Sequence, residues 1–152
     1  MVQMSLNDEC GDEEACRVAQ HTWDMVAREA FGDVVGVVNV LLCGREAMQQ
    51  MNAQYRSRDY ATDVLSFQYY ESTELSGNTD PDEVIGDMAL CLDVIRENAV
   101  SRGVSFEEEL SFMIIHGILH VCGYDHEISE EHAQQMQQQE LRLLDLLIQS
   151  GR

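Results

Sequence analysis

Three histidines lie close together in the last third of the chain, at positions 116, 120 and 126. The first two belong to residues 110–124, a segment that carries no formal charge at neutral pH and is apolar almost all round. Such a segment is typical of a buried helix, and on a helix His116 and His120 share one face because they are four residues apart. Burying two imidazoles costs free energy unless each finds a partner, and one metal ion would partner both.

The residues after this helix favour a third metal ligand. Gly123 is predicted to end the helix in a left-handed conformation, after which Tyr124 and Asp125 turn the chain so that His126 comes back toward the first two histidines. The pattern His-x-x-x-His-x-x-Gly-x-x-His has the ligand spacing of the long zinc-protease motif. Three neutral imidazoles with a fourth position open to water are typical of a catalytic zinc site, although nickel, copper or iron also suit them. Gly117 stands where the protease has its general-base glutamate, so the sequence predicts the zinc ligands without the peptidase base.

Two neighbours of these histidines have two interpretations each. Cys122 lies two positions past His120, on the opposite face of the expected helix, where a core thiol is favoured over a fourth metal ligand. Asp125 either accepts a hydrogen bond from a ligand imidazole or caps the turn after the helix. The sequence does not choose between the two roles of Asp125.

A second polar cluster occupies residues 55–67, between an expected helix and an expected strand. Its Arg56 and Arg58 are the densest basic feature of the chain. An arginine can hold a phosphate through two parallel hydrogen bonds. The alternative is that both arginines pair with acidic side chains at the surface, and the sequence alone favours this second interpretation.

The charge balance limits how the chain can meet a phosphate polymer. Its 152 residues include 28 acidic side chains, nine arginines and no lysine, for a net charge of −19. Non-specific binding to nucleic acid needs basic surface to displace counterions, so this composition argues against it. If a phosphate polymer is the substrate, the cation must be local: an arginine cluster or a metal.

No segment of the sequence indicates export or a membrane. No apolar run reaches the roughly 20 residues of a membrane helix, and the first ten residues lack the features of a signal peptide. We therefore expect a cytoplasmic protein with no membrane partner. Its five cysteines are expected to be reduced thiols, most of them buried.

Alternation of strand and helix patterns predicts one small domain spanning residues 1–152. Helices are expected at 13–31, 45–55, 93–102, 105–122 and 129–149, strands at 34–43, 63–70 and 83–92, and a polar loop at 71–82. Ser105 is expected to begin its helix, with Glu108 three residues on as a capping box. Strands separated by helices imply a sheet with helical cover, in an α+β or α/β arrangement. The strand order does not follow from these patterns.

The two polar clusters together resemble the YbeY family of bacterial metal-dependent endoribonucleases, also described as ribosomal RNA maturation factors. The family's hallmark, His-Gly-x-Leu-His-x-x-Gly-Tyr-Asp-His, is complete at residues 116–126. Its upstream motif, Asn-x-x-Tyr-Arg-x-x-Asp-x-x-Thr-Asp-Val-Leu-Ser-Phe-Pro, matches from Asn52 to Phe67, with Gln68 in place of the proline. Residues 85–88 are similar to a Gly-Asp-Ile strand of the family, and the resemblance covers roughly residues 40 to 149.

The resemblance implies an α+β fold with a mixed sheet of about four strands, covered by four to five helices. It places a metal site on a central buried helix, with one Zn²⁺ on His116, His120 and His126. It implies a single-stranded RNA substrate, a role in 16S rRNA 3′-end maturation and ribosome quality control, and the small ribosomal subunit as partner, with no DNA. It also implies that Arg56 matters for activity.

The expected chemistry is cleavage of a phosphodiester. Bound zinc lowers the pKa of its water toward neutrality, and the resulting hydroxide attacks phosphorus or takes the proton of a ribose 2′-hydroxyl. Arg56 would stabilise the charge that develops on the phosphorus oxygens. Two alternatives stay open: a non-catalytic ribosome-assembly factor with a structural zinc, and a metal-dependent hydrolase of a smaller substrate. A peptidase is least favoured, for want of the glutamate.

Overall fold

The computed structural model describes residues 1–125 and 127–149, which form a small α+β domain. Its elements are β1 (Val2–Asp8), α1 (Glu13–Phe31), β2 (Gly36–Cys43), α2 (Arg45–Arg56), β3 (Val64–Gln68), α3 (Ser72–Leu75), β4 (Val84–Cys91), α4 (Leu92–Arg102), α5 (Phe106–Val121) and α6 (Glu130–Gln149). The described residues thus contain five helices of eleven residues or more and one helix of four. Within these residues, no helix is both long enough and apolar enough to cross a bilayer.

The four strands form one mixed sheet in the order β1-β2-β4-β3, which confirms the expected architecture. Strands β1, β2 and β4 are parallel, and β3 runs antiparallel to β4 at one edge. The strand β1 was not expected. Its residues Val2, Met4 and Leu6 nevertheless alternate with polar residues, and this period of two is the pattern of a half-buried strand.

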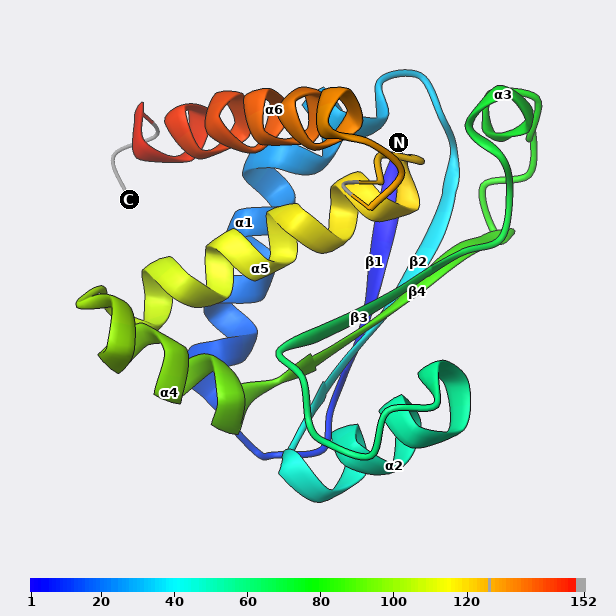
Figure 1. Ribbon diagram of the computed structural model, residues 1–152. Helices are drawn as coiled ribbons and strands as arrows, with labels where there is room; N and C mark the ends of the chain where they lie inside the picture. The colour runs from blue at the N-terminus through cyan, green and yellow to red at the C-terminus, as the bar shows by residue number, and fades with distance from the viewer. Residues whose placement is uncertain (126, 150–152) are drawn as a thin grey trace.

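The helices cover the two faces of the sheet unequally (Figure 1). The main core lies between the sheet and the helices α1 and α5, and α6 packs on these two helices on the same side. Helix α2 covers part of the opposite face with a smaller apolar cluster: Cys43, Met48, Leu65, Ala89 and Cys91. The face that carries most of the apolar burial is therefore the one on which α5, the helix of His116 and His120, is packed.

Most expected element boundaries agree with the structure to within two residues. The polar loop at 71–82 is the main exception, since it contains the short helix α3. A capping box holds this single turn: Glu71 accepts the backbone N–H of Glu74, and the side chain of Glu74 accepts the backbone N–H of Glu71. This local exchange of hydrogen bonds stabilises a helix too short to show a hydrophobic period.

Helix α5 is fixed at both ends and in the middle. Ser105 caps its start, as expected, by accepting the backbone N–H of Glu108 at 3.0 Å. In the middle, the helix approaches the sheet so closely that a Cβ added at Gly117 would lie 2.6 Å from the sulfur of Met88. At its end, Gly123 has a φ of 105°, the positive value that glycine was predicted to supply there. These contacts turn one face of α5 into the core and leave His116 and His120 on another.

Candidate active site

His116 and His120 lie side by side on α5 with their Nε2 atoms 3.2 Å apart. The ring centroids are 4.7 Å apart and the rings are inclined at 68°. Two imidazole nitrogens bound to one tetrahedral zinc ion at about 2.0–2.1 Å would lie roughly 3.3 Å apart. The observed separation therefore fits two ligands of one zinc ion.

His126, the expected third ligand, lies outside the described residues, so the three-histidine site stays a prediction. In residues 1–125 and 127–149, no group of three His, Cys, Asp or Glu side chains is placed to hold a metal ion. The chain does turn sharply just before this position. Gly123 donates its N–H to the carbonyl of His120, and Tyr124 donates to the carbonyl of Leu119, each at 3.0 Å.

The position that carries the general base in zinc proteases has no room for a carboxylate here. Gly117 faces the side chain of Met88, a residue of β4 that is 2% exposed. Any side chain at 117 would enter the core between α5 and the sheet instead of the cavity beside the histidines. The packing thus gives a physical reason for the missing base.

The structure chooses between the two interpretations of Cys122 and of Asp125. The sulfur of Cys122 points to the carbonyl of Ala30 on α1, at 3.6 Å, and burial raises the pKa of this thiol to about 12. Cys122 is therefore a protonated core thiol. Asp125 accepts the backbone N–H of Glu127 at 2.8 Å, so its carboxylate caps the turn after α5.

Glu140 of α6 is the acidic side chain that meets a histidine of the pair, and sequence reasoning missed it. One of its carboxylate oxygens lies 3.4 Å from Nδ1 of His116. A signal was present in the sequence, because Glu140 shares the helical period of Met136, Leu143 and Leu147, which are fully buried. A carboxylate on the apolar face of a helix needs a partner in the core.

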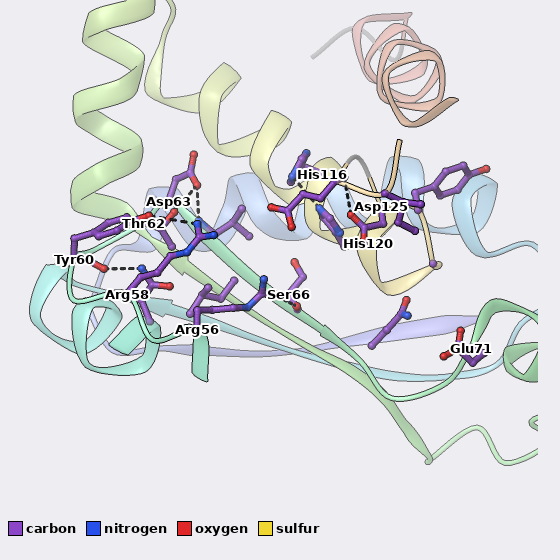
Figure 2. A pocket seen from close by; sticks show the side chains of 18 residues that line it. Arg56, Arg58, Tyr60, Thr62, Asp63, Ser66, Glu71, His116, His120 and Asp125 are labelled. Carbon is purple, nitrogen blue, oxygen red and sulfur yellow. Dashed lines mark hydrogen bonds between the residues drawn. The ribbon is translucent and has the colours of Figure 1, made fainter. Parts of the chain in front are cut away.

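A cavity of about 500 Å³ joins the histidine pair to the arginine cluster. Figure 2 shows Arg56 and Arg58 toward one end and His116, His120 and Asp125 toward the other. Its walls come from α2, β3, α5 and the loops that follow α2 and α5. Residues that are 50 or more positions apart in sequence are thereby brought to one hollow, as the predicted chemistry requires.

Arg56 and Arg58 form no ion pair with an acidic side chain in the described part of the chain. Among the described residues, ion pairs to arginine use Arg45, Arg96, Arg102 and Arg142 instead. Arg56 donates from Nη2 to the carbonyl of Ser66 at 3.2 Å, and its guanidinium carbon lies 5.7 Å from the centre of the Phe67 ring. The interpretation that the sequence favoured, surface pairing of both arginines, is therefore not what the described residues show.

The comparisons with known proteins agree with this geometry. The family model described as "Endoribonuclease YbeY" matches residues 3–147. The chain belongs to the YbeY family. Relatives named "Endoribonuclease YbeY" include those of Thermotoga neapolitana, 36% identical over 74% of this chain and 67% of the relative, and Magnetococcus marinus, 36% identical over 78% and 84%. The relative in Staphylococcus saprophyticus is 42% identical over 65% of this chain and 64% of its own length.

A solved structure supports the same family at the level of the fold. The solution structure of TM1509 from Thermotoga maritima superposes with a TM-score of 0.68 at 28% identity. The match covers 100% of this chain and 92% of the TM1509 chain. The fold of this chain is therefore shared with another protein.

Two residues of the upstream YbeY motif, Asn52 and Asp63, form hydrogen bonds that order this part of the chain. Asn52 is 2% exposed, and its side-chain amide nitrogen donates to the backbone carbonyl of Tyr60 at 2.7 Å. The backbone carbonyl of Asn52 accepts the backbone N–H of Arg58. Asp63 accepts the N–H of Val64 at 2.8 Å. Asn52 thus fixes the loop that carries Arg58. The carboxylate of Asp63 accepts a hydrogen bond from the backbone of the strand that follows it.

Proposed function

We propose that this chain is a zinc-dependent endoribonuclease that cuts single-stranded RNA, acting in 16S rRNA 3′-end maturation and ribosome quality control. The observation that carries the proposal is the cavity that holds a histidine pair at zinc-ligand spacing together with an arginine that has no acidic partner among the described residues. Membership of the YbeY family supports RNA as the substrate. The proposed partner is the small ribosomal subunit, which places the reaction in the cytoplasm.

The residues that would hold the zinc are His116 and His120 through Nε2, with His126 as the proposed third ligand. When bound, the metal would supply a water of lowered pKa and a Lewis acid for a phosphoryl oxygen. Cys122 and Asp125 are left out of the proposed donor set, since the thiol faces α1 and one oxygen of the carboxylate caps a turn. The donor set is thus all imidazole, the set that suits zinc and leaves a position for water.

Arg56 would bind the phosphate that is to be cut. The carbonyl of Ser66 accepts one N–H of its guanidinium, which orients the planar group while the other donors remain available. Contact with the Phe67 ring restricts it further. A guanidinium held in this way can stabilise charge as it develops on the phosphoryl oxygens without first reorganising.

Packing at Gly117 means that α5 supplies no carboxylate base beside the histidines. The attacking group would therefore not pass its proton to a carboxylate of α5 at this position. The same feature separates this site from that of a zinc peptidase, which depends on such a base.

The first experiment measures zinc per chain and RNA cleavage in the same preparations. We expect about one zinc per chain in the wild type, loss of zinc and activity together in His120→Ala, and loss of activity with normal zinc content in Arg56→Ala. Arg28→Ala is the matched control, because Arg28 is an exposed arginine of α1 outside the cavity. It should keep both zinc and activity.

Different results would favour different alternatives. Zinc bound by rigorously purified wild type that binds RNA without cutting it would favour a non-catalytic assembly factor. Cleavage of small phosphodiesters but not of single-stranded RNA would favour a hydrolase of smaller substrates. Equal loss of zinc and activity in Arg56→Ala would contradict the phosphate-binding role of this arginine.

A further inference from the structure

Glu140 is a charged residue in an apolar setting that the proposed mechanism does not use. It lies on the face of α6 that also carries Met136, Leu143 and Leu147, all with 0% exposure. Its side chain is only 13% exposed. Burying a carboxylate there costs free energy unless a hydrogen-bond donor faces it. The group that it faces is the imidazole of His116.

The two ring nitrogens of His116 point to different groups. Nε2 lies 3.2 Å from Nε2 of His120, and Nδ1 lies 3.4 Å from a carboxylate oxygen of Glu140. The contact at Nδ1 is roughly half an ångström longer than a strong charge-assisted hydrogen bond, a gap that a small rotation of the glutamate side chain closes. A carboxylate at Nδ1 favours the tautomer that carries its proton there. In that tautomer the lone pair of the ring is on Nε2, the atom that faces His120.

We propose that Glu140 is a positioning residue: it accepts the Nδ1–H of His116, and so orients the ring and presents Nε2 to the metal. The inference rests on the proposed zinc site and adds to it a residue from a different helix. Carboxylates behind metal-binding histidines commonly fix the tautomer and raise the basicity of the ligand. Among the acids that line the cavity, Asp125 accepts the backbone N–H of Glu127 through one of its oxygens.

This assignment gives α6 a function beyond covering the core. Helix α6 packs on α5 and α1, and Glu140 lies between the buried residues Met136 and Leu143. Packing on both sides holds the carboxylate against His116. The orientation of a metal ligand on α5 would therefore depend on the docking of a helix that supplies no ligand itself.

The first test is the zinc affinity of Glu140→Gln and Glu140→Ala, measured by competition with a chelator. Loss of an outer carboxylate typically lowers metal affinity 10- to 100-fold, and we expect a loss in that range for both variants. Glu131→Gln is the control, because it makes the same change at an exposed position of the same helix. The control should bind zinc as the wild type does. Thermal melts of the zinc-free proteins identify any variant that is unfolded. Glu140→Asp, which keeps the charge, then takes the place of that variant.

The second test reads the tautomer of His116 directly in zinc-free protein. Long-range ¹H–¹⁵N spectra at mildly alkaline pH should show the proton on Nδ1 in the wild type and in Glu131→Gln. In Glu140→Ala the proton should move toward Nε2. A purely structural role for Glu140 would lower the melting temperature without moving this proton.

The two tests also separate this inference from the proposed function. A wild type that binds no zinc would overturn the proposed function, while the tautomer of His116 would still decide whether Glu140 controls the ring. Zinc affinity within twofold of wild type in folded Glu140→Ala, with an unchanged tautomer, would overturn the role of Glu140 and leave the zinc site standing.

Discussion

The contact between Gly117 and Met88 gives a stability prediction that can be worked out from distances. A Cβ at position 117 would lie 2.6 Å from both the sulfur and the terminal methyl carbon of Met88, and 3.0 Å from its Cγ. Atoms in protein cores rarely approach this closely, so Met88 must move in the Gly117→Ala variant. Met88 is itself 2% exposed, which leaves its side chain little room to do so.

Two opposing contributions set the size of the effect. Overpacking a core typically costs about 1–3 kcal/mol, whereas alanine is favoured over glycine in a helix by about 1 kcal/mol. Gly117→Ala should therefore destabilise the wild type by about 0–2 kcal/mol. In a Met88→Ala background the obstructing atoms are gone, and the same substitution should stabilise the protein by about 1 kcal/mol. The coupling between the two sites is thus expected to be about 1–3 kcal/mol.

The measurement is a double-mutant cycle in urea, followed by circular dichroism on zinc-free protein. Met88→Ala alone should cost about 2–5 kcal/mol, so the background variant must first be shown to fold cooperatively. If Gly117→Ala changes the free energy of unfolding equally in both backgrounds, within about 0.5 kcal/mol, then the packing argument is wrong. The same result would remove the physical explanation for the absent glutamate.

Three further outcomes follow from other residues of the described chain. Gly123→Ala should lower the free energy of unfolding by about 1–3 kcal/mol in urea melts, because the residue has a φ of 105° and an added Cβ would meet Ser72 at 2.9 Å. Burial raises the pKa of Glu109, so the folded state holds this proton more tightly than the unfolded state, and that contribution to stability is lost as the pH rises through the folded pKa. Glu109→Gln removes this titration, so the melting temperature of the variant relative to that of the wild type should be higher at neutral pH than in acid. Melting temperatures measured across that pH range check this. With zinc-free protein, the affinity for single-stranded RNA should fall with salt at a log–log slope of about −1.4 if Arg56 and Arg58 are the two phosphate contacts, and Arg58→Ala should reduce that slope by about 0.7. A wild-type slope near −4 in a binding titration would mean that other cations make most of the contacts.

Features that depend on neighbours in the sequence were predictable for this chain. The apolar segment of helix α5 after its acidic first turn, the cap at Ser105 and the glycine after the helix follow from residues within a few positions of each other. The pairing of His116 with His120 follows in the same way, because a helix fixes residues four apart. The cap at Ser105 and the turn at Gly123 were expected because their signals are short-range and chemically specific.

Features that depend on distant contacts were not predictable in the same way. The partner of His116 is 24 positions away on another helix, and nothing near His116 indicates it. The arginines show the same difficulty, since Arg96 pairs with Asp12 across 84 positions while Arg56 and Arg58 pair with no acid in the described chain. Charge density along the sequence favoured the wrong interpretation, because pairing depends on which acids the fold brings close.

The missed strand β1 has a different cause. Its alternation of Val2, Met4 and Leu6 with polar residues carries a real signal, but one that extends over only three apolar residues. Burial is also incomplete, because β1 forms one edge of the sheet and its alternate residues are exposed. An edge strand therefore gives a weaker apolar signal than β2 or β4, which are flanked by strands on both sides.

The strong acidity of the chain and the proposed RNA substrate can be reconciled at the level of the cavity. Of the four acids in its wall, Asp63, Glu71 and Asp125 already accept backbone N–H groups of their own segments, and the fourth is the exposed Glu127. Arg56 and Arg58, in contrast, have no acidic partner in the described chain. Three neutral imidazoles would add no charge of their own, so a bound zinc would bring its full dication to the same hollow. At physiological salt, charges beyond roughly 8 Å are largely screened, so a strand inside the cavity would respond mainly to these local cations. Elsewhere the net charge of −19 would repel a phosphate polymer, so the proposed RNA substrate would be held mainly at this cavity.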